Sequence, residues 1–173
     1  KQYLSDKGLA KNTIGKYIKC LKTILRVAVE EGKSSNMIYT NRRFIVDVED
    51  VESVYLNESE LLQLYNLKLP QYLDNVRDMF LIGCYTGLRY SDLMRIEPQH
   101  IYEDEIEIVT KKTGKKVLVP FTHHIVRSIR DKHKGVTMNS LPHAVCNQVF
   151  NRYIKELCSR CSMLNIRVSK SIT

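Results

Sequence analysis

TGLRYSDL, residues 86–93, lies where two predicted helices meet. The apolar residues 79–85 before it are too few to cross a membrane, and they predict a helix buried in a protein core. Gly87 is suited to end that helix, and a second helix then turns three apolar side chains inward: Leu93, Met94 and Ile96. Arg89 therefore falls on the joint, where buried neighbours would hold a rigid, charged fork suited to phosphate oxygens. An ion pair between Arg89 and Asp92 that serves only the structure is an equally good interpretation.

Charge is unevenly distributed along the chain. The 173 residues carry a net charge of +8, with 43% hydrophobic and 27% charged residues, a composition typical of ordinary globular proteins of one or two domains. Basic residues outnumber acidic ones by 10 to 6 in residues 1–50, 8 to 1 in 111–150 and 5 to 1 in 151–173, whereas acidic residues prevail by 11 to 4 in 51–110. Two basic regions around an acidic one suit a protein that grips a polyanion from two sides, although chance clustering on a surface gives the same pattern.

The first long helix is predicted over residues 13–31, with Asn12 as its N-cap and Gly32 at its end. The polar residues 1–11 before it are expected to form a loop. One face of the helix is apolar at three- and four-residue intervals: Ile14, Tyr17, Ile18, Leu21, Ile24, Leu25 and Ala28. The other face carries basic residues that either meet solvent or lie against DNA phosphates: Lys16, Lys19, Lys22 and Arg26.

Residues 33–53 show no sustained helical period and are interpreted as an inter-domain linker, extended in part. They include Arg42 and Arg43, two further candidate DNA-binding residues. Because one helix cannot form a core by itself, the helix before them should belong to a small helical domain. The predicted divisions are residues 1–45 for the end of that domain, 46–55 for the linker and 56–173 for a larger domain.

The larger domain is predicted to be mainly α-helical with one small antiparallel β-hairpin. Asn57 and Glu60 have the spacing of a capping box, in front of a helix that runs to about Leu67. Pro70 breaks the chain before the helix over residues 71–86.

A period of two after residue 100 indicates the hairpin. Its first strand should contain Ile101, Ile106 and Ile108, with a turn at residues 112–115 and a return strand at 116–120. Thr122 should then cap a helix to about residue 134, and residues 141–163 should contain one or two more helices.

Lys111 and Lys112 enter the hairpin turn 22 and 23 residues after Arg89. A lysine at the tip of a hairpin can reach a ligand and donate a proton to a leaving oxygen. The combination of TGLRYSDL, a short turn and a hairpin with Lys-Thr-Gly resembles the tyrosine recombinases, the phage integrase family. Residues 117–120 are similar to that family's return strand, and the first helix with its linker is similar to the end of its DNA-clamping core-binding domain.

The resemblance implies a role for each matching residue. Arg89 matches the first catalytic arginine, which stabilises the charge on the scissile phosphate, and Asp92 matches an acidic residue that helps to fix the site. Lys112 matches the hairpin lysine that protonates the departing 5′ hydroxyl, with Lys111 as the alternative if the register differs by one residue. The family uses no metal or cofactor, and it acts on double-stranded DNA as an assembly of four protomers. The hairpin residues expected to contact DNA are Lys111, Lys115 and Lys116.

The sequence also departs from the family pattern. The family needs a His-x-x-Arg box and then a tyrosine that forms a 3′-phosphotyrosine link with DNA. His124 and Arg127 have the box spacing but follow the hairpin too closely, and Tyr153 stands in an apolar stripe typical of a core helix. We therefore expect a recombinase fragment that ends before the box and that binds DNA without cleaving it.

Other features point to no further chemistry. The five cysteines include Cys158 and Cys161 as a lone Cys-x-x-Cys pair, without the second pair that a zinc site requires. With no apparent signal peptide or membrane span, we expect a cytoplasmic protein with reduced cysteines and neither a metal nor a membrane partner.

Two other functions stay open at this level. A non-enzymatic helical DNA-binding module explains the charge distribution, and a structural or protein-interaction fragment predicts no affinity for DNA at low salt. The sequence does not define the DNA site, the biological role in a phage, transposon or resolution system, or the oligomer.

Overall fold

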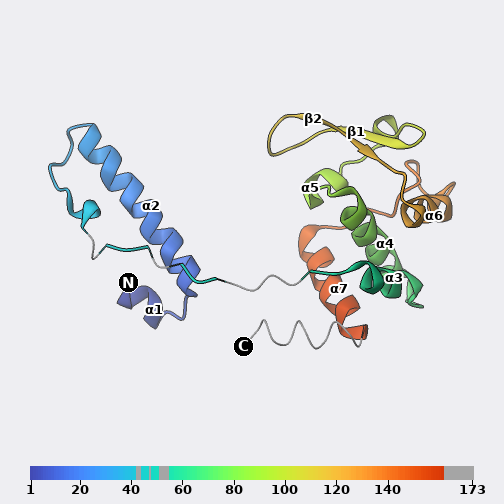
Figure 1. Cartoon of the computed structure of the whole chain (residues 1–173), viewed down its shortest axis with the longest axis horizontal. Helices are drawn as coiled ribbons and strands as arrows, with labels where there is room; N and C mark the ends of the chain where they lie inside the picture. The colour runs from blue at the N-terminus through green and yellow to red at the C-terminus, as the bar shows by residue number, and fades with distance from the viewer. Residues whose placement is uncertain (42–43, 47, 51–54, 162–173) are drawn as a thin grey trace. The chain divides into compact units, whose positions relative to one another are not determined.

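The computed structural model describes residues 1–41, 44–46, 48–50 and 55–161, as Figure 1 shows. The chain divides into two compact units, Lys1–Ser53 and Val54–Thr173. The prediction of a mainly helical fold with a two-stranded antiparallel sheet is confirmed. No helix in the described part of the chain combines the length and the apolar character needed to cross a membrane.

The described residues of unit 1 form two α-helices and a short 3-10 helix: α1 (Gln2–Asp6), α2 (Lys11–Glu30) and η1 (Ile38–Thr40). The expected loop at residues 1–11 is therefore wrong, because α1 occupies part of it. Gly32 adopts the left-handed conformation just after α2, with φ of 68°, which fits its predicted role at the helix end.

Asn12 is not the N-cap that the sequence predicted. The N-cap of α2 is Ala10, so Asn12 stands inside the first turn with its side chain free for other partners. Its amide nitrogen donates to the carbonyl oxygen of Glu49 at 2.8 Å, and its amide oxygen accepts from the N–H of Glu49, also at 2.8 Å. Residues 48–50, which were predicted to be linker, are thus fastened to the start of α2.

The apolar face of α2 is only partly buried within unit 1. Ile14 and Ile18 are buried as predicted, and Leu25 and Ala28 are half-buried. Other members of the predicted stripe are exposed in the described structure: Tyr17, Leu21 and Ile24. The described residues of unit 1 therefore cover only part of the stripe.

Unit 2 is built around helix α4. Its elements are α3 (Glu58–Asn66), α4 (Gln71–Thr86), α5 (Tyr90–Leu93), η2 (Pro98–His100), β1 (Glu105–Val109), β2 (Lys116–Pro120), α6 (His124–His133) and α7 (Asn147–Arg160). Helix α4 packs against α3, α6 and α7, and the hairpin lies beyond α5 (Figure 1). The core contains apolar side chains from all these layers, including Met79, Leu81, Ile82, Leu93, Ile106 and Ile125.

The hairpin and the helix after it differ in detail from the prediction. Strand β1 begins at Glu105, because η2 and the turn after it occupy residues 98–104, and Ile101 forms only an isolated bridge with Ile106. Strand β2 covers the predicted residues, with Val109 opposite Lys116. The N-cap of α6 is His123 and makes no side-chain cap, so the prediction that Thr122 caps this helix is wrong.

A buried polar network joins α4 to α6. Asp78 is fully buried, and its Oδ1 accepts from Arg77 Nε at 3.0 Å and from Arg77 Nη2 at 2.8 Å. Its Oδ2 accepts from Lys132 at 2.7 Å and lies 3.0 Å from His133 Nε2. Asp74 accepts from both Arg77 and Lys132 at the edge of the network. Buried charges in this network are therefore paired, as stability requires.

The capping box at the start of α3 should contribute to the stability of the fold, and a substitution can test this. Asn57 Oδ1 accepts from the Glu60 N–H at 3.0 Å, and the Glu60 carboxylate accepts from the Asn57 N–H at 2.8 Å. Replacing Asn57 with alanine should lower the free energy of unfolding by about 1 kcal/mol, because this change removes an N-cap acceptor. Urea unfolding followed by circular dichroism measures the change. The control is Asn66→Ala at the exposed end of α3, and an equal loss in both variants would contradict the role of the cap.

Candidate nucleic-acid interface

Arg89 occupies the joint between α4 and α5. Gly87 ends α4 in the left-handed conformation, with φ of 66°, and Arg89 is the N-cap of α5. The carbonyl oxygen of Arg89 accepts from the N–H groups of Asp92 at 2.8 Å and Leu93 at 2.9 Å, and both of those residues are buried. The backbone is thus anchored, but the Arg89 side chain is exposed rather than enclosed by its neighbours.

Asp92 links α5 to the hairpin loop. It is fully buried, and its Oδ1 accepts from the Lys111 N–H at 2.8 Å and from Arg95 Nη2 at 3.0 Å. Its Oδ2 is buried without a hydrogen-bond partner among the described residues. The ion pair of Asp92 is made with Arg95, and none with Arg89 occurs within the described structure, so the structural alternative for Arg89 is not supported.

The surroundings of Asp92 favour its charged form. The hydrogen bond from the Lys111 N–H holds the pKa of the Asp92 carboxyl below its usual value, although burial acts in the opposite direction. Arg95 lowers the pKa through both its hydrogen bond and its charge, and the charge of Arg89 adds to this effect. The anionic carboxylate is therefore suited to hold basic groups in place.

The loop between β1 and β2 presents three lysines to solvent. Thr110 closes the loop, since its N–H donates to the Lys115 carbonyl oxygen and its own carbonyl oxygen accepts from the Gly114 N–H, both at 2.9 Å. Gly114 has a φ of 64°, a conformation that glycine adopts without strain. Lys111, Lys112 and Lys115 are exposed on this ordered loop. Lys116 instead pairs with Glu107 across the strands at 2.7 Å.

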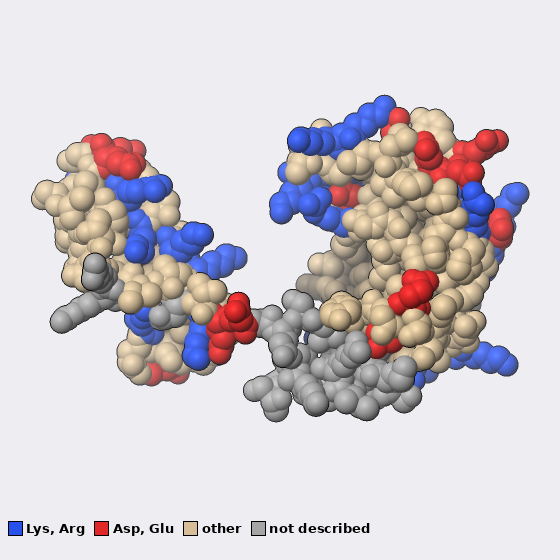
Figure 2. Space-filling model, in the orientation of Figure 1, with Lys and Arg blue, Asp and Glu red and all other residues tan. Residues whose placement is uncertain are grey.

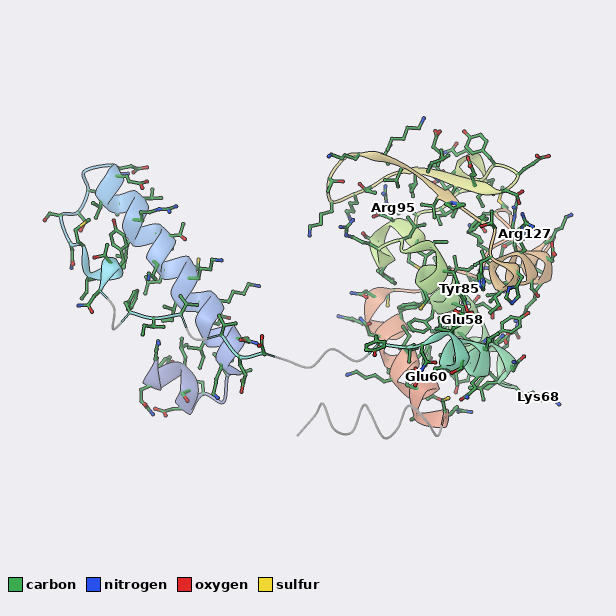
Figure 3. All side chains as sticks on the ribbon, viewed as in Figure 1. Glu58, Glu60, Lys68, Tyr85, Arg95 and Arg127 are labelled. Atoms are coloured by element: carbon green, nitrogen blue, oxygen red, sulfur yellow. The ribbon has the colours of Figure 1, made fainter. Side chains whose placement is uncertain are left out.

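Basic side chains gather at the turn end of the hairpin and over α5. Figure 2 shows this gathering, with acidic side chains toward the opposite end of the hairpin, and Figure 3 shows Arg95 at α5 beneath the hairpin. We call this surface the basic hairpin face, and it comprises Arg95, Lys111, Lys112 and Lys115, while Arg89 is exposed at the N-cap of the adjoining α5. The hydrogen bonds of Asp92 with Arg95 and with the Lys111 N–H hold the α5 segment next to the hairpin loop, which lies about 20 residues further along the chain.

A second basic surface lies on α2 in unit 1. Lys16 and Lys19 are exposed there, as Figure 2 also shows for the helix as a whole. Lys22 is half-buried, because its ammonium donates to the Phe44 carbonyl oxygen at 3.2 Å and lies 5.9 Å from the Phe44 ring centroid. Arg26 pairs with Glu30 at 3.6 Å.

A cavity of about 500 Å³ opens on the same surface. It is lined by Lys19, Lys22, Thr23, Arg26, Tyr39 and Val46. Its basic lining could accept a phosphate group. The remaining predicted DNA-binding residues, Arg42 and Arg43, lie outside the described residues.

The other residues considered in the sequence have structural surroundings. Tyr153 is half-buried against the core, with its ring centroid 5.1 Å from that of Tyr72. Arg127 pairs with Asp104 at 2.9 Å, and His124 is exposed at the start of α6. Within the described ranges, no group of three or more His, Cys, Asp and Glu side chains is arranged to hold a metal ion.

Two features of the structure were missed by sequence reasoning. Arg95 stands three residues after Asp92, a helical spacing that could have suggested their pairing. His133 has no ligand or catalytic spacing in the sequence, yet it belongs to the buried network around Asp78.

Comparison with known proteins gives three matches. Residues 1–44 match the family model described as the phage integrase SAM-like domain. The chain resembles a lambda integrase dimer bound to a COC′ core site, with a TM-score of 0.68 and 19% identity over 90% of this chain and 47% of that chain. It also resembles a lambda integrase tetramer bound to a Holliday junction, with a TM-score of 0.60 and 20% identity over 81% of this chain and 44% of that chain. A search of curated protein sequences finds no match.

These findings establish the fold of the chain. The chain has the fold of lambda integrase and spans about half the length of the lambda integrase chains that it matches. Its first 44 residues are similar to the phage integrase SAM-like domain. The predicted resemblance to the phage integrase, or tyrosine recombinase, family is supported by the fold of the chain and by the domain match over residues 1–44.

Proposed function

We propose that this chain is the DNA-binding part of a site-specific recombinase, which in the complete protein cuts and rejoins DNA through a 3′-phosphotyrosine intermediate. The observation that best supports the proposal is the 2.8 Å hydrogen bond from the Lys111 N–H to Asp92 Oδ1. This bond holds the lysine loop against the short helix that begins at Arg89. In this proposal Arg89 and Lys112, which come from distant segments, act on the same phosphodiester.

Each residue of this site has a separate role in the proposal. The Arg89 guanidinium binds the non-bridging phosphate oxygens and stabilises the charge that develops on them during cleavage. The Lys112 ammonium, or that of Lys111 in the alternative register, donates a proton to the departing 5′ oxygen. Asp92 positions the loop. Here the arginine and lysine supply the positive charge that metal ions supply in many other phosphoryl-transfer sites.

The two units divide the DNA contacts between them in this proposal. Residues 1–45 form the end of a core-binding domain, 46–55 a linker and 56–173 the first part of a catalytic domain. Lys16 and Lys19 of α2 contact phosphates, since both are exposed, whereas Lys22 mainly supports the segment around Phe44.

The partners are double-stranded DNA and further protomers, because the similar lambda integrase structures are a dimer and a tetramer on DNA. A cytoplasmic location is part of the same proposal.

This polypeptide should bind DNA without becoming attached to it. Tyr153 is the one tyrosine after the hairpin in the sequence, and its ring packs against Tyr72 and the core. A half-buried ring that packs against the core is poorly placed to attack phosphorus. A nicked suicide substrate incubated with the chain should therefore give no covalent adduct, and an adduct mapped to Tyr153 would overturn this part of the proposal.

DNA affinity tests the proposal directly. The chain should bind a random-sequence duplex of about 30 base pairs at low salt, and Arg89→Ala and Lys112→Ala should each weaken binding about fivefold to tenfold. Each change should also lower the slope of log K against log salt by about one, because one phosphate contact is lost. Fluorescence anisotropy over a range of salt concentrations measures both quantities.

The matched control is Lys68→Ala. Lys68 is an exposed lysine at the end of α3 away from the hairpin, as Figure 3 shows, and its loss changes the net charge by the same amount. Affinity should stay within about twofold of the wild type, since only general charge is removed. Equal losses in all three variants would reject a defined site, and no binding at low salt would reject DNA as the partner.

A recombinase and a simple DNA-binding module differ in the complete chain. In a recombinase, Arg89→Ala and Lys112→Ala should abolish cleavage while changing affinity by a smaller factor, because both residues act mainly in the transition state. A binding module would lose only affinity. Cleavage assays with a chain extended to include its tyrosine would separate these alternatives.

A further inference from the structure

Arg95 connects α5 to the hairpin through a single guanidinium group. Its Nη2 donates to Asp92 Oδ1 at 3.0 Å and to the Val109 carbonyl oxygen, also at 3.0 Å. Its Nε donates to the Ser91 carbonyl oxygen at 3.2 Å. The side chain is half exposed and reaches from just beyond α5 to the last residue of β1 (Figure 3). Three acceptors around one planar fork define a single orientation of the arginine.

The bonds of Arg95 and Asp92 hold the hairpin on both sides of Thr110. Val109, just before Thr110, is held through its carbonyl oxygen by Arg95. Lys111, just after Thr110, is held through its N–H by Asp92. Asp92 Oδ1 accepts from both Arg95 and Lys111, so the two attachments share one buried atom. We call this arrangement the Arg95 latch.

We propose that Arg95 is a positioning residue for the lysine loop, an inference that rests on the proposed function. The latch fixes the start of the loop relative to α5, whose N-cap is Arg89. Lys112 follows directly on the fixed Lys111, so its ammonium reaches the phosphate from a defined place. Without the latch, the lysine loop would have to be ordered when the chain binds DNA. The entropy lost in that ordering would lower the affinity for DNA.

The competing role for Arg95 is a direct contact with DNA through its charge alone. The variant Arg95→Lys separates the two roles, because lysine keeps the charge but has no planar fork that can bridge Asp92 and Val109. A charge contact would survive this substitution. The latch would not.

Hydrogen exchange of the Lys111 amide in the DNA-free chain tests the latch independently of function. In Arg95→Lys, this amide should exchange about tenfold faster by NMR, since weakening the network around Asp92 exposes its hydrogen bond. Amides in α4 should keep their wild-type rates, which shows that the effect is local and not a general loss of stability. An unchanged Lys111 rate would overturn the proposal.

Arg127→Lys is the matched control. Arg127 is exposed to a similar degree, 51% against 47% for Arg95, and it pairs with Asp104 at 2.9 Å near the other end of the hairpin. Its replacement should leave the Lys111 amide unchanged, because Asp104 has no bond to the lysine loop in the described structure. A faster Lys111 rate in this control would mean that any hairpin arginine has the same effect, and the specific latch would be rejected.

DNA binding then tests whether positioning matters. Arg95→Lys should weaken binding about threefold to tenfold with an unchanged salt slope, and Lys112→Ala should cost less in the Arg95→Lys background than in the wild type. Additive effects of the two changes would reject positioning. If the wild-type chain binds no DNA at low salt, the proposed function fails, whereas the exchange rates still decide whether the latch exists.

Discussion

Replacing Asp78 with alanine should lower the free energy of unfolding of unit 2 by about 3–5 kcal/mol, because this change leaves buried charge without its partner. Asp78 is fully buried and accepts hydrogen bonds from Arg77, Lys132 and His133. Arg77 is itself only 5% exposed, so water cannot replace the lost carboxylate. Asp74 remains to neutralise part of the charge, but it lies at the edge of the network and does not reach His133 in the described structure. Urea unfolding of the whole chain, followed by circular dichroism, measures the loss.

Two variants serve as controls for Asp78→Ala. Asp104→Ala removes an exposed carboxylate that pairs with Arg127, and it should cost less than about 1 kcal/mol because water screens this pair. Asp78→Asn keeps the shape of the side chain but removes its charge, so it should still destabilise the fold by more than Asp104→Ala. If Asp78→Ala and Asp104→Ala cost the same, the buried network would not contribute to stability as we describe.

The same network predicts how stability depends on pH. Burial by itself would raise the pKa of Asp78, but hydrogen bonds from Lys132, Arg77 and His133 outweigh burial and hold the pKa below its ordinary value. A carboxyl of this kind stabilises the fold above its unfolded-state pKa of about 4. That stabilisation is lost as the pH falls below this value, because the unfolded chain binds the proton more readily. The free energy of unfolding of Asp78→Asn should therefore fall less steeply in acid than that of the wild type.

Local sequence patterns were sufficient to predict the helices and the hairpin that carry the candidate site. The Gly87 cap, the capping box of Asn57 and the hairpin turn each depend on residues a few positions apart, so their chemistry could be interpreted without the fold. Asn12 shows the limit of this reasoning. It is a good N-cap residue by type, but its amide instead binds Glu49, which lies 37 residues away.

Side-chain partners from distant segments could not be predicted in the same way. Lys22 looked like any other lysine on the basic face of α2, yet the Phe44 carbonyl oxygen engages it. The position of Arg95 between α5 and the hairpin could not be predicted, because its second acceptor, the Val109 carbonyl oxygen, is identified only once the hairpin is folded onto α5. The charged pair of Arg77 and Asp78 inside an apolar helix was the one available signal for the buried network, since charges are rarely buried without partners.

Phe121→Ala should also cost about 3–5 kcal/mol of unfolding free energy, because this change removes a large buried ring and leaves a cavity. Phe121 follows the last residue of β2 and is only 1% exposed in the core of unit 2. Its N–H donates to the Asp104 carbonyl oxygen at 2.6 Å, and the Arg130 guanidinium lies 5.8 Å from its ring centroid. The residue thus anchors the base of the hairpin to the core just before α6 begins.

Leu118→Ala is the matched comparison for Phe121→Ala, since Leu118 is also a large apolar residue and lies three positions earlier, in the middle of β2. Leu118 is 55% exposed, so its truncation should change the free energy of unfolding by less than about 0.5 kcal/mol. Phe121→Leu should give an intermediate loss, because leucine fills part of the site. Thermal and urea unfolding measure all three variants. Similar losses for Phe121→Ala and Leu118→Ala would mean that the hairpin is not held by its base, and the basic hairpin face would then lack the rigid support that a phosphate site needs.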